Sequence, residues 1–140
     1  MSFYKILQNF HSGWAYLTLL MGVLFVLMVG YFAFSKKART AGITKLSFFA
    51  TLTFHIQLLV GVVLYFVSPY AQFTENTMKD ATNRLYAMEH PLMMFAAVVL
   101  ITIANAKLKK SESVPMASFI LGLIALVLVL SRIPWSAWLG

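Results

Sequence analysis

The sequence predicts an all-α integral membrane protein: one domain, residues 1–140, folded as an antiparallel bundle of four transmembrane helices with both termini outside. Of its 140 residues, 61% are hydrophobic and only 11% are charged, whereas a soluble domain is roughly half apolar and about a quarter charged. Four apolar runs approach the ~20 residues that a helix needs to cross ~30 Å of hydrocarbon. The chain has no cysteine, which excludes disulfides, iron–sulfur ligation and covalent haem attachment.

The apolar runs predict spans at residues 12–34, 46–67, 84–106 and 114–131. Two of the connections between them, "SKKARTAGITK" and "KLKKSES", are short, and the middle one, "SPYAQFTENTMKDATN", is longer and polar. Short connections favour an up-and-down bundle in which successive helices run in opposite directions. A long first run with no cleavage site after it argues against a removable signal peptide.

Basic residues set the expected orientation, because Lys and Arg are enriched in cytoplasmic loops. The two short connections carry Lys36, Lys37, Arg39 and Lys45, and Lys107, Lys109 and Lys110 beside Glu112. The longer connection is close to neutral, so we expect it outside together with both termini. Aromatic residues expected at the outer interface are Trp14, Tyr16, Tyr65, Tyr70, Trp135 and Trp138. The net charge of +7 is thus explained by topology, and a nucleic-acid partner is not expected.

Each of the three histidines, His11, His55 and His90, falls in or beside an apolar run. A titratable side chain is costly in lipid and usually faces the protein interior, so each is a candidate for function. A buried, hydrogen-bonded structural histidine is the alternative for any one of them. A b-type haem needs only two neutral imidazoles on facing helices and an apolar slot. We therefore predict that two of the three histidines are haem iron ligands.

His90 is the expected common ligand, because its estimated depth lies between those of the other two histidines. Side-chain spacing favours His11 as its partner, since the face that continues from His11 carries the small residues Ala15 and Gly22. The face that continues from His55 is bulky, which leaves His55 as a hydrogen-bonding residue or an alternative ligand. The choice between them stays open at this level.

Charged residues flank His90 at the outer end. Glu89 is expected either to pair with Arg84 or to orient an imidazole, contact a quinone or move a proton. Arg84 and Arg132 are expected either to bind haem propionates or to anchor helix ends at the membrane surface. Pro91 either bends the helix beside His90 or marks its first turn.

The strings "HSGWAY", "FHIQLLVGVVLYFVSP", "MKDATNRLYAMEHPLMM" and "SRIPW" resemble a family of small bacterial membrane proteins labelled cytochrome b-like, along nearly the whole chain. The resemblance implies a bacterial inner-membrane protein that binds haem b. Trp14-Ala15 departs from the family, whose members often carry arginine just after His-Ser-Gly.

A more distant similarity is to one four-helix half of haem A synthase, which has a Gln-x-x-x-Gly helix between two outer histidines. Gln57 and Gly61 stand between His11 and His90 in that order, so this similarity implies that these two histidines pair and that Gln57 and Gly61 belong to the site. His55 departs from the pattern. The synthase activity is not implied by half of its scaffold.

The expected function is therefore that of a bis-histidine b-type cytochrome that carries electrons to or from a quinone or a respiratory partner. The alternative is a haem-free accessory or assembly subunit of a membrane complex, whose histidines tie helices together. A stand-alone enzyme is less expected, since no nucleotide or flavin motif is present.

Overall fold

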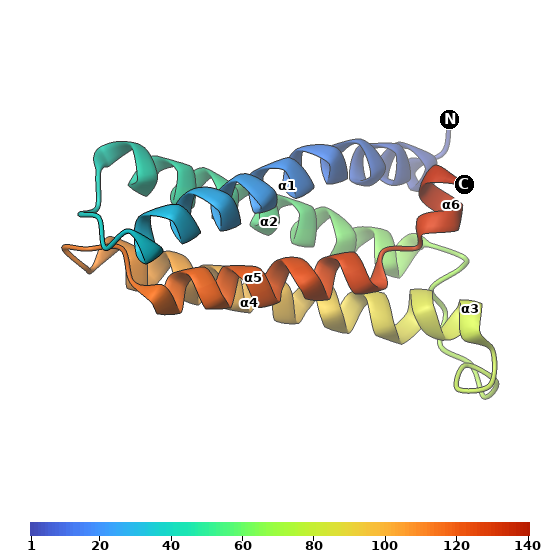
Figure 1. Ribbon diagram of the computed structural model, residues 1–140. Helices are drawn as coiled ribbons and strands as arrows, with labels where there is room; N and C mark the ends of the chain where they lie inside the picture. Colours follow the sequence, from blue (N-terminus) through green and yellow to red (C-terminus); the bar gives the residue numbers. More distant parts are fainter.

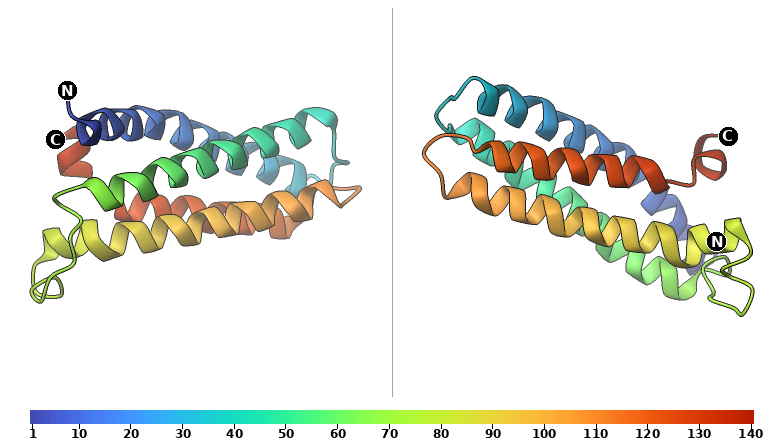
Figure 2. Two further views of the ribbon diagram at one scale, coloured as in Figure 1. Left: turned by 180° about the vertical axis from the view of Figure 1, so that it is seen from behind. Right: turned by 60° about the horizontal axis from the view of Figure 1, so that its bottom comes forward.

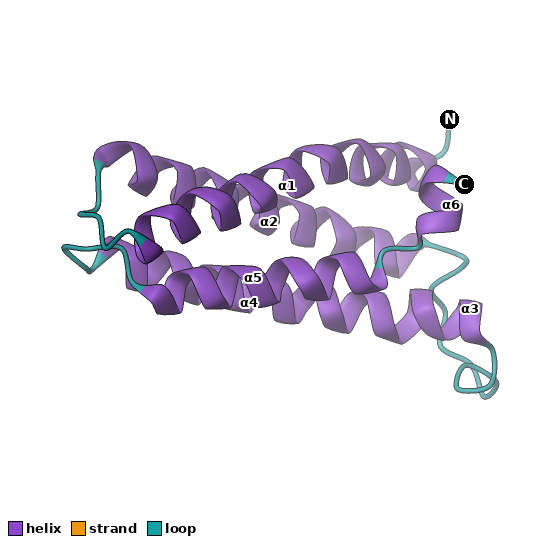
Figure 3. Cartoon of the chain, viewed as in Figure 1, coloured by secondary structure: helices purple, strands orange, loops and turns teal.

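The computed structural model describes residues 1–140 and is helical, without β-strands. Its four long helices are α1 (Phe3–Phe34), α2 (Ala41–Val67), α4 (His90–Lys109) and α5 (Met116–Arg132). A short helix α3 (Ala81–Arg84) and a π turn, η1 (Leu85–Glu89), lead directly into α4, and α6 (Trp135–Leu139) ends the chain. Figure 3 shows that the remaining segments are loops, joined at one point by an isolated bridge between Ala38 and Ser113.

Side-chain caps determine where the long helices begin. The Ser2 hydroxyl accepts a hydrogen bond from the Lys5 N–H at 3.2 Å, so α1 starts well before the predicted apolar span and includes His11. The Thr40 hydroxyl accepts from the Ile43 N–H at 3.2 Å and starts α2 in the same way. The helices therefore extend beyond the apolar runs at these ends.

Three helical stretches are long and apolar enough to cross a membrane, namely Phe3–Phe34, Ala41–Val67 and Ala81–Lys109. The fourth apolar helix, α5, has 17 residues and is about 25 Å long at ~1.5 Å per residue. The coarse prediction of an all-helical protein with apolar, membrane-length helices is confirmed.

The four long helices lie side by side in a bundle (Figure 1). Helix α1 packs against α2 and α5, and α4 packs against the same two helices, so α1 and α4 stand on opposite corners. Both termini lie at one end of the molecule, and the α1–α2 and α4–α5 connections lie at the other (Figures 1 and 2). We call these the terminal end and the loop end.

Most of the hydrophobic core lies in the half of the bundle near the loop end, and on α5 it continues towards the terminal end as far as Val129. Its α1 members begin at Phe25, its α2 members end at Phe54, and its α4 members begin at Ala97. The glycine Gly122 lets the ring of Phe25 approach the backbone of α5, since a Cβ there would clash with that ring. Towards the terminal end, no residue of α1 before Thr18, none of α2 after Phe54, and none in residues 90–96 of α4 is fully buried. Fully buried residues are therefore fewer in this part of the bundle.

Candidate functional site

His11 and His90 meet near the terminal end of the bundle. Their ring centroids are 6.2 Å apart and their ring planes are inclined at 85°. They project from α1 and α4, the two helices on opposite corners, so the pair lies across the middle of the bundle. The structure thus brings together the two histidines that side-chain spacing and the resemblance favoured.

The orientation of His90 is fixed through its Nδ1 atom, which lies 2.8 Å from the backbone carbonyl oxygen of Arg132. A carbonyl oxygen can only accept a hydrogen bond, so Nδ1 carries the hydrogen and donates it. In the neutral ring Nε2 is then the nitrogen with a free lone pair. Nε2 has no hydrogen-bond partner and is not sealed from solvent. This arrangement is typical of metal-ligating histidines, whose second nitrogen donates to a carbonyl or carboxylate.

The π turn η1 immediately precedes His90, whose backbone N–H donates to the Leu85 carbonyl five residues earlier. In a regular α-helix residue 91 would donate to the Ala87 carbonyl, but Pro91 has no N–H. The Tyr65 hydroxyl, from α2, donates to that carbonyl instead at 2.9 Å. Pro91 therefore lies inside a continuous helical stretch, and its missing hydrogen bond is replaced from a neighbouring helix.

His11 presents one edge of its ring to α2. A Cβ added at Gly61 would lie 3.2 Å from Cε1 and 3.8 Å from Nδ1 of His11, so glycine allows the ring to pack directly on the α2 backbone. One turn away, Gln57 Nε2 donates to the His11 carbonyl oxygen at 2.8 Å. His11 Nδ1 and Gln57 Oε1 are both buried without a partner. The Nε2 atom of His11 likewise has no partner but is not sealed from solvent.

An ion cluster adjoins His90 at the terminal end. Glu89 Oε2 lies 3.0 Å from Arg84 Nε, and Glu89 Oε1 lies 3.8 Å from Arg132 Nε. Arg84 also donates from Nη1 to the Met78 carbonyl oxygen at 2.6 Å. The local pair with Arg84 is thus present, and Arg132 contacts the same carboxylate while its carbonyl holds His90. Each of the three side chains keeps a quarter or more of its surface exposed.

His55 lies away from this pair. Its Nε2 is 2.8 Å from Thr102 Oγ1, and the Thr102 hydroxyl itself donates to the Val98 carbonyl oxygen at 2.6 Å. Since that hydroxyl hydrogen is used, His55 Nε2 donates to the threonine. Thr102 is about 18 Å along α4 from His90, at ~1.5 Å per residue, and the His55 side chain is exposed. His55 links α2 to α4 and does not reach the other two histidines.

The spacing of His11 and His90 would suit two histidine ligands of a haem, and the chain has no cluster that would hold a metal ion with three protein side chains. If imidazole nitrogens bind iron at about 2 Å, as they bind zinc, with each ring centre roughly 1 Å behind its nitrogen, two axial rings have centres about 6 Å apart. The observed separation is 6.2 Å. Neither Nε2 atom has a hydrogen-bond partner, and His11 Nδ1 and Gln57 Oε1 are buried without one.

Sequence reasoning missed two contacts that build this site. The carbonyl of Arg132 cannot be identified from residue type, because any residue could supply it at the end of α5. The Tyr65 contact with Ala87 could have been sought from Pro91, since a proline inside a helix always leaves one carbonyl without its N–H donor.

Comparison of the chain with protein-family models, with curated proteins and with solved structures gave no match. The function is therefore argued from the site.

Proposed function

We propose that the protein is a membrane b-type cytochrome in which His11 and His90 bind one haem b, and that it transfers electrons to or from a quinone or a respiratory partner. The observation that carries the proposal is the His11–His90 pair itself: 6.2 Å between ring centres, on opposite corners of the bundle. The proposal is supported by His90 Nδ1, which is held by a carbonyl and leaves Nε2 available as a ligand.

The protein's own residues bind and orient the haem in this proposal, and the haem supplies a one-electron iron couple. The Arg132 carbonyl fixes the tautomer of His90 and makes its Nε2 a better ligand. Gly61 gives the ring of His11 its position against α2. Arg84 and Arg132 place two guanidinium groups on the terminal side of His90, where they suit the propionate carboxylates of a haem. Glu89 holds these two arginines.

The membrane topology belongs to the same proposal. We propose that α1, α2, α4 and α5 each span the inner membrane of a bacterium in an antiparallel bundle, with both termini on the outer, periplasmic side. Seven basic side chains in the two loop-end connections support a cytoplasmic loop end. Because α5 is short, its span is completed by the residues just before Met116 or by local thinning of the bilayer.

Replacement of the histidines one at a time tests the proposal. The purified wild-type protein should show a b-type absorption spectrum, and His90→Ala and His11→Ala should lose most of the haem or change it from six-coordinate to five-coordinate. His55→Ala is the matched control, because this histidine bonds Thr102 and lies outside the pair. It should retain the wild-type spectrum.

The alternative, a haem-free accessory or assembly subunit, is supported by the bond from His90 to Arg132, which ties α4 to the end of α5. It predicts a colourless, well-folded wild-type protein from haem-replete cells. That result, or an unchanged haem spectrum in both His11→Ala and His90→Ala, would overturn the cytochrome proposal.

A further inference from the structure

A groove opens between α2 and α4 near the loop end, far from the histidine pair. It is open to the surroundings, has a volume of about 460 Å³ and is lined by Thr44, Lys45, Phe48, Phe49, Asn105 and Lys109. It has no part in the proposed haem site, and its residues come from the first turns of α2 and the last turns of α4.

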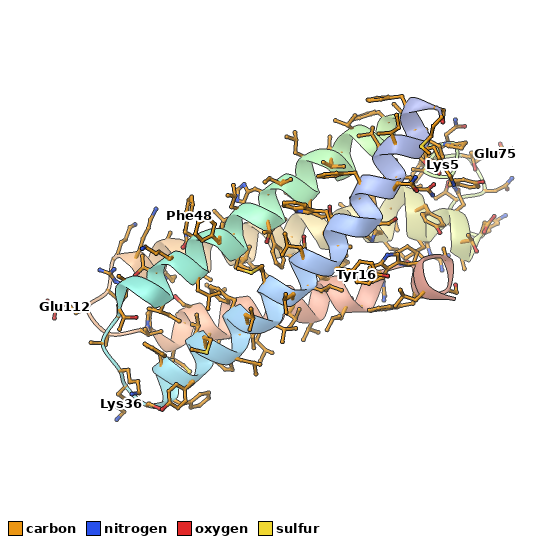
Figure 4. All side chains as sticks on the ribbon, turned by 90° about the horizontal axis from the view of Figure 1, so that it is seen from above. Lys5, Tyr16, Lys36, Phe48, Glu75 and Glu112 are labelled. Atoms are coloured by element: carbon orange, nitrogen blue, oxygen red, sulfur yellow. The ribbon has the colours of Figure 1, made fainter.

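The charged side chains of the groove lie nearest the loop end, and its apolar side chains lie further along the helices. Lys45 and Lys109 lie nearest the loop end, and the neighbouring turns of the same helices place Phe48, Phe49 and Asn105 about one turn, or ~5–6 Å, further in. Both phenylalanine side chains are about half exposed (53% and 52%). Figure 4 shows Phe48 on α2 turned away from the bundle. The groove therefore has a cationic mouth and an apolar interior that faces the surroundings of the bundle.

No acidic side chain neutralises the two lysines. The two ion pairs of the protein both involve Glu89 at the terminal end. The one acidic residue at the loop end, Glu112, stands among seven basic residues in the two connections there. Figure 4 shows Lys36 and Glu112 at this end and Glu75 at the opposite end.

Asn105 and the neighbouring Arg39 bring hydrogen-bond donors to the groove. Asn105 Oδ1 accepts from the buried Ser47 hydroxyl at 2.7 Å, which turns the amide nitrogen of Asn105 away from Ser47 without a partner. Arg39 is held beside the mouth, since its Nε donates to the Ser111 carbonyl at 2.9 Å and its Nη1 donates to Thr44 Oγ1 at 3.0 Å. Donors and cations without acidic partners suit an anionic phosphate group.

We propose that this groove binds an anionic phospholipid, whose phosphate lies between Lys45 and Lys109 and whose acyl chains pack on Phe48 and Phe49. Basic pockets between transmembrane helices on the cytoplasmic side bind anionic lipid headgroups by this chemistry. The proposal uses the membrane location of the helices and is independent of haem.

Lipid binding can be measured by native mass spectrometry of the full-length protein with phosphatidylglycerol and with phosphatidylcholine of the same acyl chains. The wild type should bind one phosphatidylglycerol in preference to phosphatidylcholine. The double variant Lys45→Gln/Lys109→Gln should lose about fivefold in this preference per lysine, as expected for basic residues at an anionic surface. The control Lys36→Gln/Lys110→Gln removes the same charge at the same end but leaves the groove intact, so its preference should stay within about twofold of the wild type.

Two further measurements distinguish a lipid-binding site from a site that binds any phosphate group. Phe49→Ser should weaken phosphatidylglycerol binding, and soluble glycerol 3-phosphate should fail to displace the lipid, because it has no acyl chains to bury. An equal loss in the groove and control variants would show general charge attraction and overturn the proposal. Displacement by glycerol 3-phosphate would overturn it as well, in favour of a simple phosphate site.

Discussion

The two nitrogens of His90 have different roles. Nδ1 is committed to the Arg132 carbonyl, which leaves Nε2 as the only nitrogen that can bind another group. His11 differs, since its Nδ1 is buried without a partner beside the equally unpaired Gln57 Oε1. An unsatisfied buried polar atom costs about 1–3 kcal/mol. Both atoms belong to residues joined by the bond from Gln57 Nε2 to the His11 carbonyl, which marks this contact as a candidate binding site.

Gly61 gives a test at the residue scale. A methyl group there would lie 3.2 Å from His11 Cε1, so Gly61→Ala should push the ring of His11 by a few tenths of an ångström and weaken haem binding or shift its absorption band. Gly13→Ala, on the exposed side of α1 with nothing within 4 Å, is the control. It should keep the wild-type spectrum and gain up to ~1 kcal/mol from better helix propensity. Haem titration compares the haem affinities of the two variants, and thermal unfolding compares their stabilities. Identical haem affinities would argue against contact between Gly61 and the site.

At the scale of elements, the stretch from α3 through η1 to α4 sets the direction of His90. A π turn inserts one residue into the helix and rotates the residues before the turn relative to those after it. Here the turn spans Leu85–Glu89, so it brings Glu89 towards Arg84 and Arg132 while His90 faces the interior. The Tyr65 hydroxyl secures the adjoining carbonyl of Ala87.

Removing that hydroxyl should loosen the turn. Tyr65→Phe should lower the free energy of unfolding by about 1–3 kcal/mol, because the Ala87 carbonyl is left without a donor. Tyr31→Phe serves as the control, since Tyr31 is exposed near the loop end and its hydroxyl makes no hydrogen bond in the protein. Denaturant unfolding in detergent measures the free energy of unfolding of both variants. Equal stability of both variants would contradict the role assigned to Tyr65.

For the whole molecule, packing divides the bundle into two halves. The half near the loop end has a continuous core that includes Phe25 and Ile101, which are almost completely buried. The half near the terminal end holds His11, His90 and the ion cluster, and no residue of α1 before Thr18 is fully buried there. We infer that the first half contributes most of the stability, while the second carries the candidate site.

The sequence predicted the helical class and roughly where the long apolar helices lie, because the length of an apolar run indicates the length of the helix that it forms. The helix ends were not predicted, since α1 begins at a Ser2 cap outside its apolar run. The proximity of His11 and His90 was expected from small-residue spacing, which left His55 as an alternative, and was implied by the resemblance to haem A synthase. The π turn and the Arg132 carbonyl could not be foreseen, because both depend on how separate helices meet.

The most direct test of the central claim is a low-temperature EPR spectrum of the purified ferric wild-type protein, recorded together with its haem content. Coordination by both His11 and His90 predicts about one haem b per chain and a low-spin ferric signal from an iron with two axial imidazoles. A predominantly high-spin signal, which indicates a single axial ligand, would contradict the account, and so would a folded protein that contains no haem.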